Sequence, residues 1–174
     1  PEHPVLQDLD LHVAPGETVA LVGPTGCGKT TILSLLMRFF DVRQGAIRLD
    51  GQDVRDMELM SLRRQFGMVL QETLLFNTSI AENIAYSRPG ATRAQIEQAA
   101  RVAEIHGFIS TLPDGYDAVL GQHGVQLSIG QKQRLNIARA VLADPAMIIM
   151  DEATSALDSE SEKAIQTAMD AFLK

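Results

Sequence analysis

Residues 17–40 read ETVALVGPTGCGKTTILSLLMRFF and give the clearest indication of the fold class. Its first part, 17–22, is a short apolar run with β-branched residues that stops at a glycine, which is typical of a buried strand. A glycine-rich loop follows over 23–28. The last part, 30–40, is apolar on most faces and predicts a buried helix. A strand, a loop and a helix in this order indicate an α/β architecture.

The loop and the start of the helix match the phosphate-binding pattern G-x-x-x-x-G-K-[ST]. Glycines let the backbone turn tightly and direct several N–H groups at one point, and the N-terminus of the following helix favours an anion. We expect Lys29 to reach the β- and γ-phosphates of ATP and the Thr30 hydroxyl to ligate Mg²⁺. The alternative, a glycine-rich turn with a solvated lysine, is disfavoured by the position between strand and helix. The expected nucleotide-binding residues are Gly23, Pro24, Thr25, Gly26, Cys27, Gly28, Lys29, Thr30 and Thr31.

Cys27, the one cysteine, lies in this loop and can form no internal disulfide, which fits a reducing compartment. We favour a role as a small residue in a tight turn. A redox-sensitive role is the alternative, because a helix N-terminus favours the reactive thiolate.

The composition, with 174 residues of which 45% are hydrophobic and 21% charged, suits about one folded domain. No apolar run approaches the roughly 18 residues of a membrane-spanning helix. The net charge of −7 argues against a nucleic-acid surface. We therefore expect no nucleic-acid partner and no direct insertion of this segment into a membrane.

Three further runs predict strands, namely 45–50, 66–70 and the continuous apolar run 146–150, which suits the centre of a parallel sheet. The last run ends at Asp151 and Glu152. Carboxylates at the C-terminal end of a buried strand lie where α/β sheets bind ligands. We expect Asp151 to serve Mg²⁺ and Glu152 to act as the general base, or orienter, of an attacking water.

Helical patterns fill the middle of the chain. Thr92 and Gln95 form a capping-box pattern ahead of apolar residues at helical spacing, and Gly107 is the expected end of that helix. Residues 131–143 predict a second helix, and an apolar stripe over 164–172 predicts a last one.

Residues 127–140, LSIGQKQRLNIARA, resemble the signature segment of ABC (ATP-binding cassette) proteins. Ser155, Ala156, Leu157 and Asp158 look like the D-loop of that family, and Gln71 looks like its Q-loop glutamine. The stretches 74–84, 112–116 and 121–127 are similar to those of the exporter type. The signature residues carried over are Leu127, Ser128, Ile129, Gly130 and Gln131.

The resemblance implies an α/β fold of the P-loop NTPase kind, with a mostly parallel sheet, a small antiparallel β part near the N-terminus and a helical subdomain. Residues 1–77 and 144–174 would form the catalytic core of one partial domain, and about 78–143 the subdomain. ATP and Mg²⁺ are the implied cofactors, with Gln71 contacting Mg²⁺ or water. The implied partners are a second such ATPase domain, arranged head to tail across ATP, and a transmembrane domain. The implied location is the cytoplasmic face of a membrane, the inner membrane if the source is bacterial.

The sequence departs from the family at several points. Ile129 stands where glycine is usual, so the site is either weakened or, as we favour, little affected, because Ser128 and Gly130 remain. Gln122 and His123 replace a usual Glu-Arg pair. The adenine-stacking aromatic residue and the switch histidine of the family have no counterpart here, so we expect a truncated chain that by itself binds nucleotide weakly and turns over poorly.

Three functions remain open at this point. The first is an exporter ATPase, which the motifs favour. The second is a non-transport ABC protein acting on nucleic acid or ribosomes, which the acidic balance disfavours. The third is a degenerate domain that binds ATP without efficient hydrolysis, which Glu152 opposes and Ile129 leaves open.

Overall fold

The computed structural model of the protein describes residues 5–70, 74–121, 124–151 and 163. The chain divides into two compact units, Pro1–Arg64 and Gln65–Lys174. None of the described helices combines the length and the apolar character that crossing a membrane requires.

The first unit contains helices α1 (Lys29–Leu36) and α2 (Leu59–Arg64), the short 3-10 helix η1 (Val54–Asp56), and strands β1 (Arg48–Leu49) and β2 (Gln52–Asp53). β1 and β2 pair antiparallel, with Leu49 opposite Gln52. The residues between them, Asp50 and Gly51, both have positive φ, at 50° and 81°, which suits a tight hairpin turn. The predicted strand 45–50 is therefore present only in its last residues, and the antiparallel pair is confirmed.

Two predictions for this unit are wrong. Residues 17–22 form no strand, and Val19, Leu21 and Val22 are 39%, 37% and 89% exposed. A run of apolar residues becomes a strand only when a neighbouring strand hydrogen-bonds to it. Strand formation therefore depends on that neighbour more than on composition. The predicted buried helix 30–40 begins at Lys29 and ends at Leu36, and it has no buried residue. It stops early because Arg38 takes a left-handed conformation with φ at 55°.

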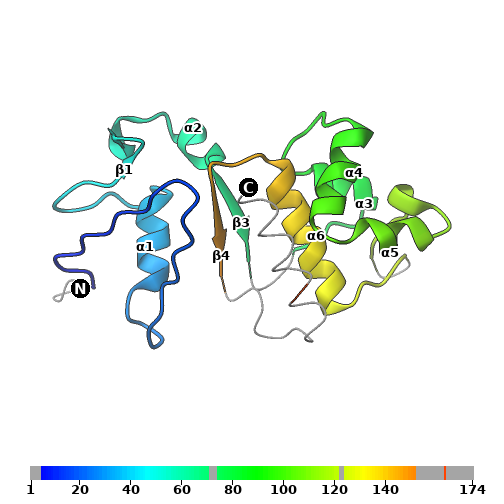
Figure 1. Ribbon diagram of the computed structural model, residues 1–174, viewed down its shortest axis with the longest axis horizontal. Helices are drawn as coiled ribbons and strands as arrows, with labels where there is room; N and C mark the ends of the chain where they lie inside the picture. Colours follow the sequence, from blue (N-terminus) through cyan, green and yellow to red (C-terminus); the bar gives the residue numbers. More distant parts are fainter. Residues whose placement is uncertain (1–4, 71–73, 122–123, 152–162, 164–174) are drawn as a thin grey trace. The chain divides into compact units, whose positions relative to one another are not determined.

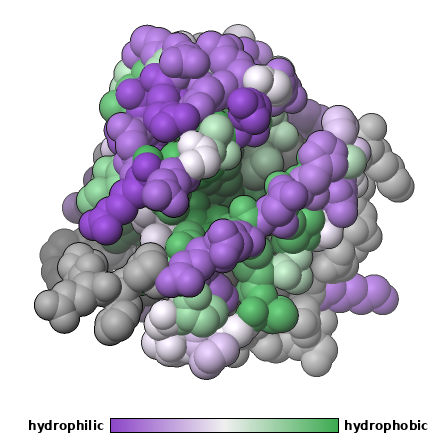
Figure 2. All heavy atoms as spheres, turned by 90° about the vertical axis from the view of Figure 1, so that its left-hand side faces the viewer, coloured by the Kyte–Doolittle hydropathy of each residue, from purple (hydrophilic) through white to green (hydrophobic). Residues whose placement is uncertain are grey.

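Few apolar side chains of the first unit are buried. The face drawn in Figure 2 carries hydrophobic side chains among hydrophilic ones. Among the large apolar residues of the first unit that reach the surface are Phe39 and Phe40, at 54% and 70% exposure. The buried apolar side chains of its described residues are Met37, Val54 and Leu62.

The second unit is built around a pair of parallel strands and a cluster of helices (Figure 1). Strand β3 (Phe66–Val69) runs parallel to β4 (Met147–Met150), with Phe66 opposite Met147 and Val69 opposite Met150. The two strands confirm the runs 66–70 and 146–150. β4 is less covered than expected, because only Ile149 is buried and Met150 is 37% exposed.

The helices of this unit are α3 (Ile80–Ala85), α4 (Arg93–Val102), α5 (His106–Thr111) and α6 (Ile129–Leu142), with the 3-10 turn η2 (Gly115–Asp117). α6 packs on α3, α4 and β3. The shared core contains Val69, Ile80, Ile84, Ile96, Ala99, Ala100, Ile105, Ile109, Leu120, Leu135, Ile137 and Leu142.

Side-chain caps set where these helices begin. Thr92 Oγ1 accepts a hydrogen bond from the Gln95 amide at 3.3 Å, and Gln95 Oε1 accepts one from the Thr92 amide at 2.9 Å, so the predicted capping box is confirmed. A second box joins Ser128 and Gln131. It starts α6 at Ile129, two residues before the predicted 131.

The predicted stop at Gly107 is wrong. α4 ends at Val102, and Gly107 lies inside α5. The end is a Schellman motif, in which the amide of Ile105 donates to Ala100 O at 3.0 Å and the amide of Glu104 donates to Arg101 O at 3.0 Å. Glu104 adopts the left-handed conformation, with φ at 54°, that glycine usually takes there. The predicted helix over 164–172 lies outside the described residues.

Candidate nucleotide-binding site

The glycine-rich loop leads directly into α1. Gly26 and Gly28 have φ of 84° and 107°, a region that L side chains rarely adopt. A Cβ added at Gly28 would also lie 2.8 Å from Leu6 Cδ2, so the Leu6 side chain would have to shift. The loop conformation therefore requires glycine at both positions.

The first hydrogen bond of α1 runs from the Ile32 amide to Gly28 O, at 3.0 Å. The amides of Lys29, Thr30 and Thr31 precede this bond and have no carbonyl partner within the helix. Free N–H groups and the positive end of the helix dipole form a place where an anion is stabilised. This is the electrostatic setting that phosphate binding requires.

The Lys29 ammonium lies inside the loop. Its Nζ donates to Gly23 O at 2.6 Å and to Pro24 O at 3.1 Å, and it lies 3.9 Å from Cys27 Sγ. Lys29 is partly exposed, so its charge is accessible from solvent. Cys27 is a free, exposed thiol in this loop. Three residues of the predicted phosphate loop, Gly23, Pro24 and Cys27, thus surround the Lys29 ammonium.

Asp151 follows β4 at the carboxyl end of the parallel pair. Its amide donates to Val69 O at 3.0 Å, which continues the pairing of β3 and β4 by one step. Its side chain is exposed. Gln71 comes two residues after Val69 in the chain, and residues 71–73 lie outside those described, as do Glu152 and 155–158. The described strand ends therefore bring Asp151 beside the backbone that leads to Gln71.

The signature residues form the beginning of α6. Ser128 is its N-cap, and Ser128 Oγ accepts from the Gln131 amide at 3.2 Å. Leu127 and Gly130 are buried, whereas Ser128 is exposed. Ile129 is helical and 63% exposed, so its branched side chain does not crowd the core of this unit. The start of α6 therefore offers exposed polar groups and a helix N-terminus.

Two of the residues predicted to serve Mg²⁺ lie within the described part of the chain, one in each unit. Thr30 and Asp151 offer oxygen ligands, and Mg²⁺ in nucleotide sites uses one or two such protein ligands beside phosphates and water. Over 5–70, 74–121 and 124–151, no cluster of three or more His, Cys, Asp or Glu side chains could hold a metal by itself. The phosphate loop and Asp151 belong to different units, and their proximity remains a prediction.

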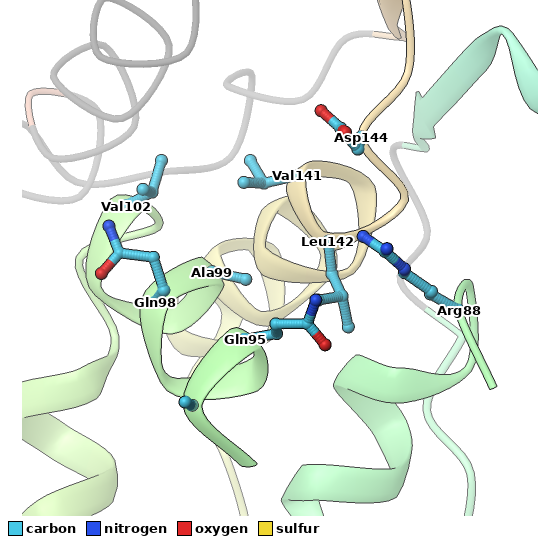
Figure 3. Close-up of a pocket in the computed structure, with 9 residues that line it drawn as sticks. Arg88, Gln95, Gln98, Ala99, Val102, Val141, Leu142 and Asp144 are labelled. Atoms are coloured by element: carbon cyan, nitrogen blue, oxygen red, sulfur yellow. The ribbon is translucent and has the colours of Figure 1, made fainter. Parts of the chain in front are cut away.

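A pocket of about 360 Å³ lies between α4 and the last turn of α6 (Figure 3). Gln95 and Ala99 of α4 lie opposite Val141 and Leu142 of α6, with Arg88 and Asp144 nearby. It is at the other end of α6 from Ser128, and a helix of 14 residues is about 20 Å long. The pocket is therefore separate from the signature residues.

Two polar side chains with central structural positions were missed by the sequence analysis. Asn83 is fully buried, and Arg139 lies between the helices of the second unit. A signal was present for Arg139, because Leu135 and Leu142 lie four residues before and three after it, on the core side of α6. An arginine at a core-facing helical position needs buried partners.

Residues 6–155 match the ABC transporter family. The chain is 54% identical over 173 residues to ABC transporter B family member 1 of Arabidopsis thaliana, covering 99% of this chain and 14% of that protein. It is 49% identical over 171 residues to the ATP-dependent lipid A-core flippase of Syntrophus aciditrophicus (strain SB), covering 98% of this chain and 28% of that protein.

Among solved structures, the chain is similar to a bacterial Atm1-family ABC exporter with ATP bound, with a TM-score of 0.88 and 46% identity. That likeness covers 98% of this chain and 30% of the exporter chain. It confirms the predicted α/β fold of the P-loop NTPase kind. The chain thus spans less than a third of the length of each of these relatives.

Proposed function

The chain belongs to the ABC transporter family, and from this premise we propose that it is the ATP-binding and ATP-hydrolysing domain of a membrane exporter. The observation that carries the proposal is the Lys29 ammonium, held by loop carbonyls at the N-terminus of α1. A cation and free amides at one place stabilise the terminal phosphates of a nucleotide.

The chemistry requires positioning and charge neutralisation more than covalent help. The amides at the start of α1 and the Lys29 ammonium would hold the phosphates. Mg²⁺, bound with the nucleotide by Thr30, Gln71 and Asp151, would neutralise the charge on the phosphate oxygens. Glu152 would accept a proton from the attacking water, or orient it, and Gln71 would help to place that water.

A second copy of such a domain would complete the site. The exposed Ser128 and the N-terminus of α6 would contact the terminal phosphate of a nucleotide held by the partner domain. Residues 155–158 would form the D-loop beside that interface. ATP would then stabilise the closed pair by its higher affinity for that state, and hydrolysis would release it.

The relatives support export. Their names describe a lipid flippase and an exporter, and the chain covers less than a third of each. We propose that the remaining length of the parent protein includes a transmembrane domain, so that this domain acts at the cytoplasmic face of a membrane, the inner membrane if the source is bacterial. Residues 1–77 and 144–174 would form its catalytic core and about 78–143 its helical subdomain.

The other two functions receive less support. A non-transport ABC protein is disfavoured by these names and by the net charge of −7, which suits nucleic acid poorly. A degenerate domain is disfavoured because Ile129 fits the helical backbone and leaves the Ser128 cap intact.

The test is ATP hydrolysis by the full-length parent in lipid, with and without Glu152→Gln. We expect the substitution to lower kcat by about 10²–10⁴-fold, the usual contribution of a general base. Glu97→Gln is the matched control, because Glu97 lies on α4 in no proposed site, and it should leave kcat unchanged. Sustained hydrolysis by the Glu152→Gln protein would refute the assignment of Glu152 as the general base. A parent without ATPase activity would refute the proposed function.

A further inference from the structure

The C-terminal end of α1 has a defined main-chain geometry. The amide of Phe39 donates to Ser34 O at 2.8 Å. The amide of Arg38 donates to Leu35 O at 3.1 Å, and the two bonds together form a Schellman motif. Arg38 occupies the left-handed position of that motif, with φ at 55°. The carbonyls of Met37 and Arg38 come after the last helical acceptors and need partners from outside the helix.

Arg63 of α2 donates to both of these carbonyls. Its Nε donates to Met37 O at 3.3 Å, and its Nη2 donates to Arg38 O at 3.4 Å. Its guanidinium carbon also lies 4.8 Å from the centre of the Phe39 ring. A planar group with two donors and an aromatic ring against its face fixes an angle as well as a distance. Its positive charge is also favourable at the C-terminal end of a helix dipole.

Arg38 makes the opposite contacts, from the end of α1 to the backbone before α2. Its Nη1 donates to Val54 O at 3.3 Å and to Met57 O at 3.0 Å, and its Nε pairs with Asp41 at 3.2 Å. Val54 begins η1, and Met57 follows it. Each segment therefore supplies one arginine to the carbonyls of the other, and we call Arg38 and Arg63 the arginine pair.

The arginine pair lies where the first unit has its buried side chains. Met37 precedes Arg38, Leu62 precedes Arg63, and Val54 supplies one of the acceptor carbonyls. Over Lys29–Leu36, in contrast, no side chain of α1 is fully buried. The direction of α1 within this unit therefore depends strongly on the contacts at its C-terminal end.

The other end of the same helix carries the phosphate loop. α1 has eight residues and is about 12 Å long at 1.5 Å per residue. A helix this short behaves as a rigid rod, so a tilt at its C-terminal end also displaces the amides that begin at Lys29. Contacts to a ligand require placement within about 0.5 Å. A small change in the direction of α1 is therefore enough to weaken phosphate binding.

We propose that Arg63 is a positioning residue that, together with Arg38, fixes the direction of α1 and so aims the Lys29 ammonium and the neighbouring amides at the phosphates of ATP. This inference rests on the proposed function, because it takes the loop at 23–30 as the phosphate site. Arg63 itself touches no nucleotide in this account. It acts through the carbonyls of Met37 and Arg38, at the opposite end of the helix.

The test is Arg63→Met in the full-length parent in lipid, titrated with a fluorescent ATP analogue. Methionine is of similar length but has no donor for the two carbonyls. We expect the Kd of the analogue to rise about tenfold, with the number of binding sites per protein unchanged, because misplacement by a remote substitution weakens contacts without removing them. Thermal unfolding, recorded on the same samples, verifies that the variant is folded.

A double-mutant cycle with Lys29→Met separates positioning from general stabilisation. Once the Lys29 ammonium is removed, Arg63 has less left to aim, so Arg63→Met should raise the Kd at most about threefold further. An effect of Arg63 that does not pass through the loop would multiply with that of Lys29→Met instead.

Arg64→Met is the matched control, because it removes the same charge from the next residue of the same helix. Arg64 is exposed, and the two carbonyls at the end of α1 accept from Arg63. The Kd of this variant should equal that of the parent. If Arg63→Met cannot be folded, Arg63→Lys keeps the charge but cannot span both carbonyls with one planar group, and it should raise the Kd about threefold.

Three results would overturn the inference. The first is fewer binding sites with an unchanged Kd, which would show that Arg63 only supports the fold. The second is an equal effect of Arg63→Met with and without Lys29, and the third is an unchanged Kd in every folded Arg63 variant. A parent that binds no ATP would defeat the proposed function and this inference together, whereas a parent that binds and hydrolyses ATP with unaffected variants would defeat the inference alone.

Discussion

In the first unit the described buried apolar side chains are Met37, Val54 and Leu62, whereas the second unit has a continuous core that includes Ile80, Ile84 and Leu135. The difference shows that the two units obtain their shape from different sources. The phosphate loop depends on local features, namely glycines with positive φ and the start of a helix. The signature residues depend on a capping box and on packing between elements distant in sequence.

The two units should therefore respond differently to substitution. A change in the phosphate loop should affect phosphate binding with little effect on stability, whereas a change behind the signature residues should affect stability first.

The largest expected effect is on hydrolysis. Lys29→Met in the full-length parent should lower kcat/KM for ATP by about 10²–10³-fold, the usual result of removing one group that stabilises transition-state charge. Lys29 is partly exposed and donates its hydrogen bonds to carbonyls of its own loop, so the melting temperature should be unchanged. The measurement is ATPase activity beside thermal unfolding. A large fall in melting temperature would show that Lys29 supports the fold and would contradict a purely local role of the loop.

The next effect is on the core of the second unit. Leu135→Ala removes a fully buried side chain of α6 and should lower the local unfolding free energy by about 2–5 kcal/mol. Hydrogen exchange of the α4 and α6 amides in the parent protein measures this free energy. Exchange in α1 should be unaffected, and acceleration there would contradict a division into separately stabilised units.

A smaller effect separates capping from nucleotide contact. Ser128→Ala and Ser79→Ala each remove the hydroxyl of a capping box, at the starts of α6 and α3, and each should cost about 1 kcal/mol of local stability. Only Ser128→Ala should also lower ATP turnover, because only Ser128 is expected to face a nucleotide. Hydrogen exchange and ATPase assays on both variants decide this, and equal turnover in the two would refute the role of Ser128.

The smallest effect is on acid stability in the first unit. The hydrogen bonds that Asp53 accepts from Arg55 lower its pKa from 3.8 to about 2. A lowered carboxyl pKa stabilises the folded state above pH 3.8, and this contribution disappears as the pH falls toward about 2. The side chains are close to solvent, so the change in stability is small. A carboxyl titration by NMR should give about 2 for the parent and a higher value for Arg55→Met, and an equal value in both would contradict the assignment.

Sequence reasoning succeeded where the determinant is local. The loop over 23–30 could be predicted because its glycines and Lys29 act within eight residues, and the Thr92 cap because its partner Gln95 is one helical turn away. The strands 66–69 and 147–150 were recognisable as apolar runs between polar turns. For the same reason, the family was recognisable from short motifs in a fixed order.

It failed where the determinant is distant or unusual. The pattern of residues 17–22 predicts a strand, but a strand also needs a neighbouring strand to pair with. The composition of the run does not show whether such a neighbour is present. The end of α4 depends on Glu104 in a conformation that usually belongs to glycine. Arg139 donates a hydrogen bond to the carbonyl of Leu74, which lies 65 positions away in the sequence. The roles of Gln71, Glu152 and 155–158 remain predictions.

The proposed function requires that the loop at 23–30 and the carboxylate of Asp151 act on one nucleotide. The most direct measurement is a double-mutant cycle of Lys29→Met and Asp151→Asn on kcat/KM for ATP in the full-length parent. Groups of one site are strongly non-additive, so we predict that the double variant loses at most about threefold more than the worse single variant. If the two losses simply multiply, as for independent sites more than about 7–10 Å apart, the loop and the carboxylate do not share a nucleotide and the account is wrong.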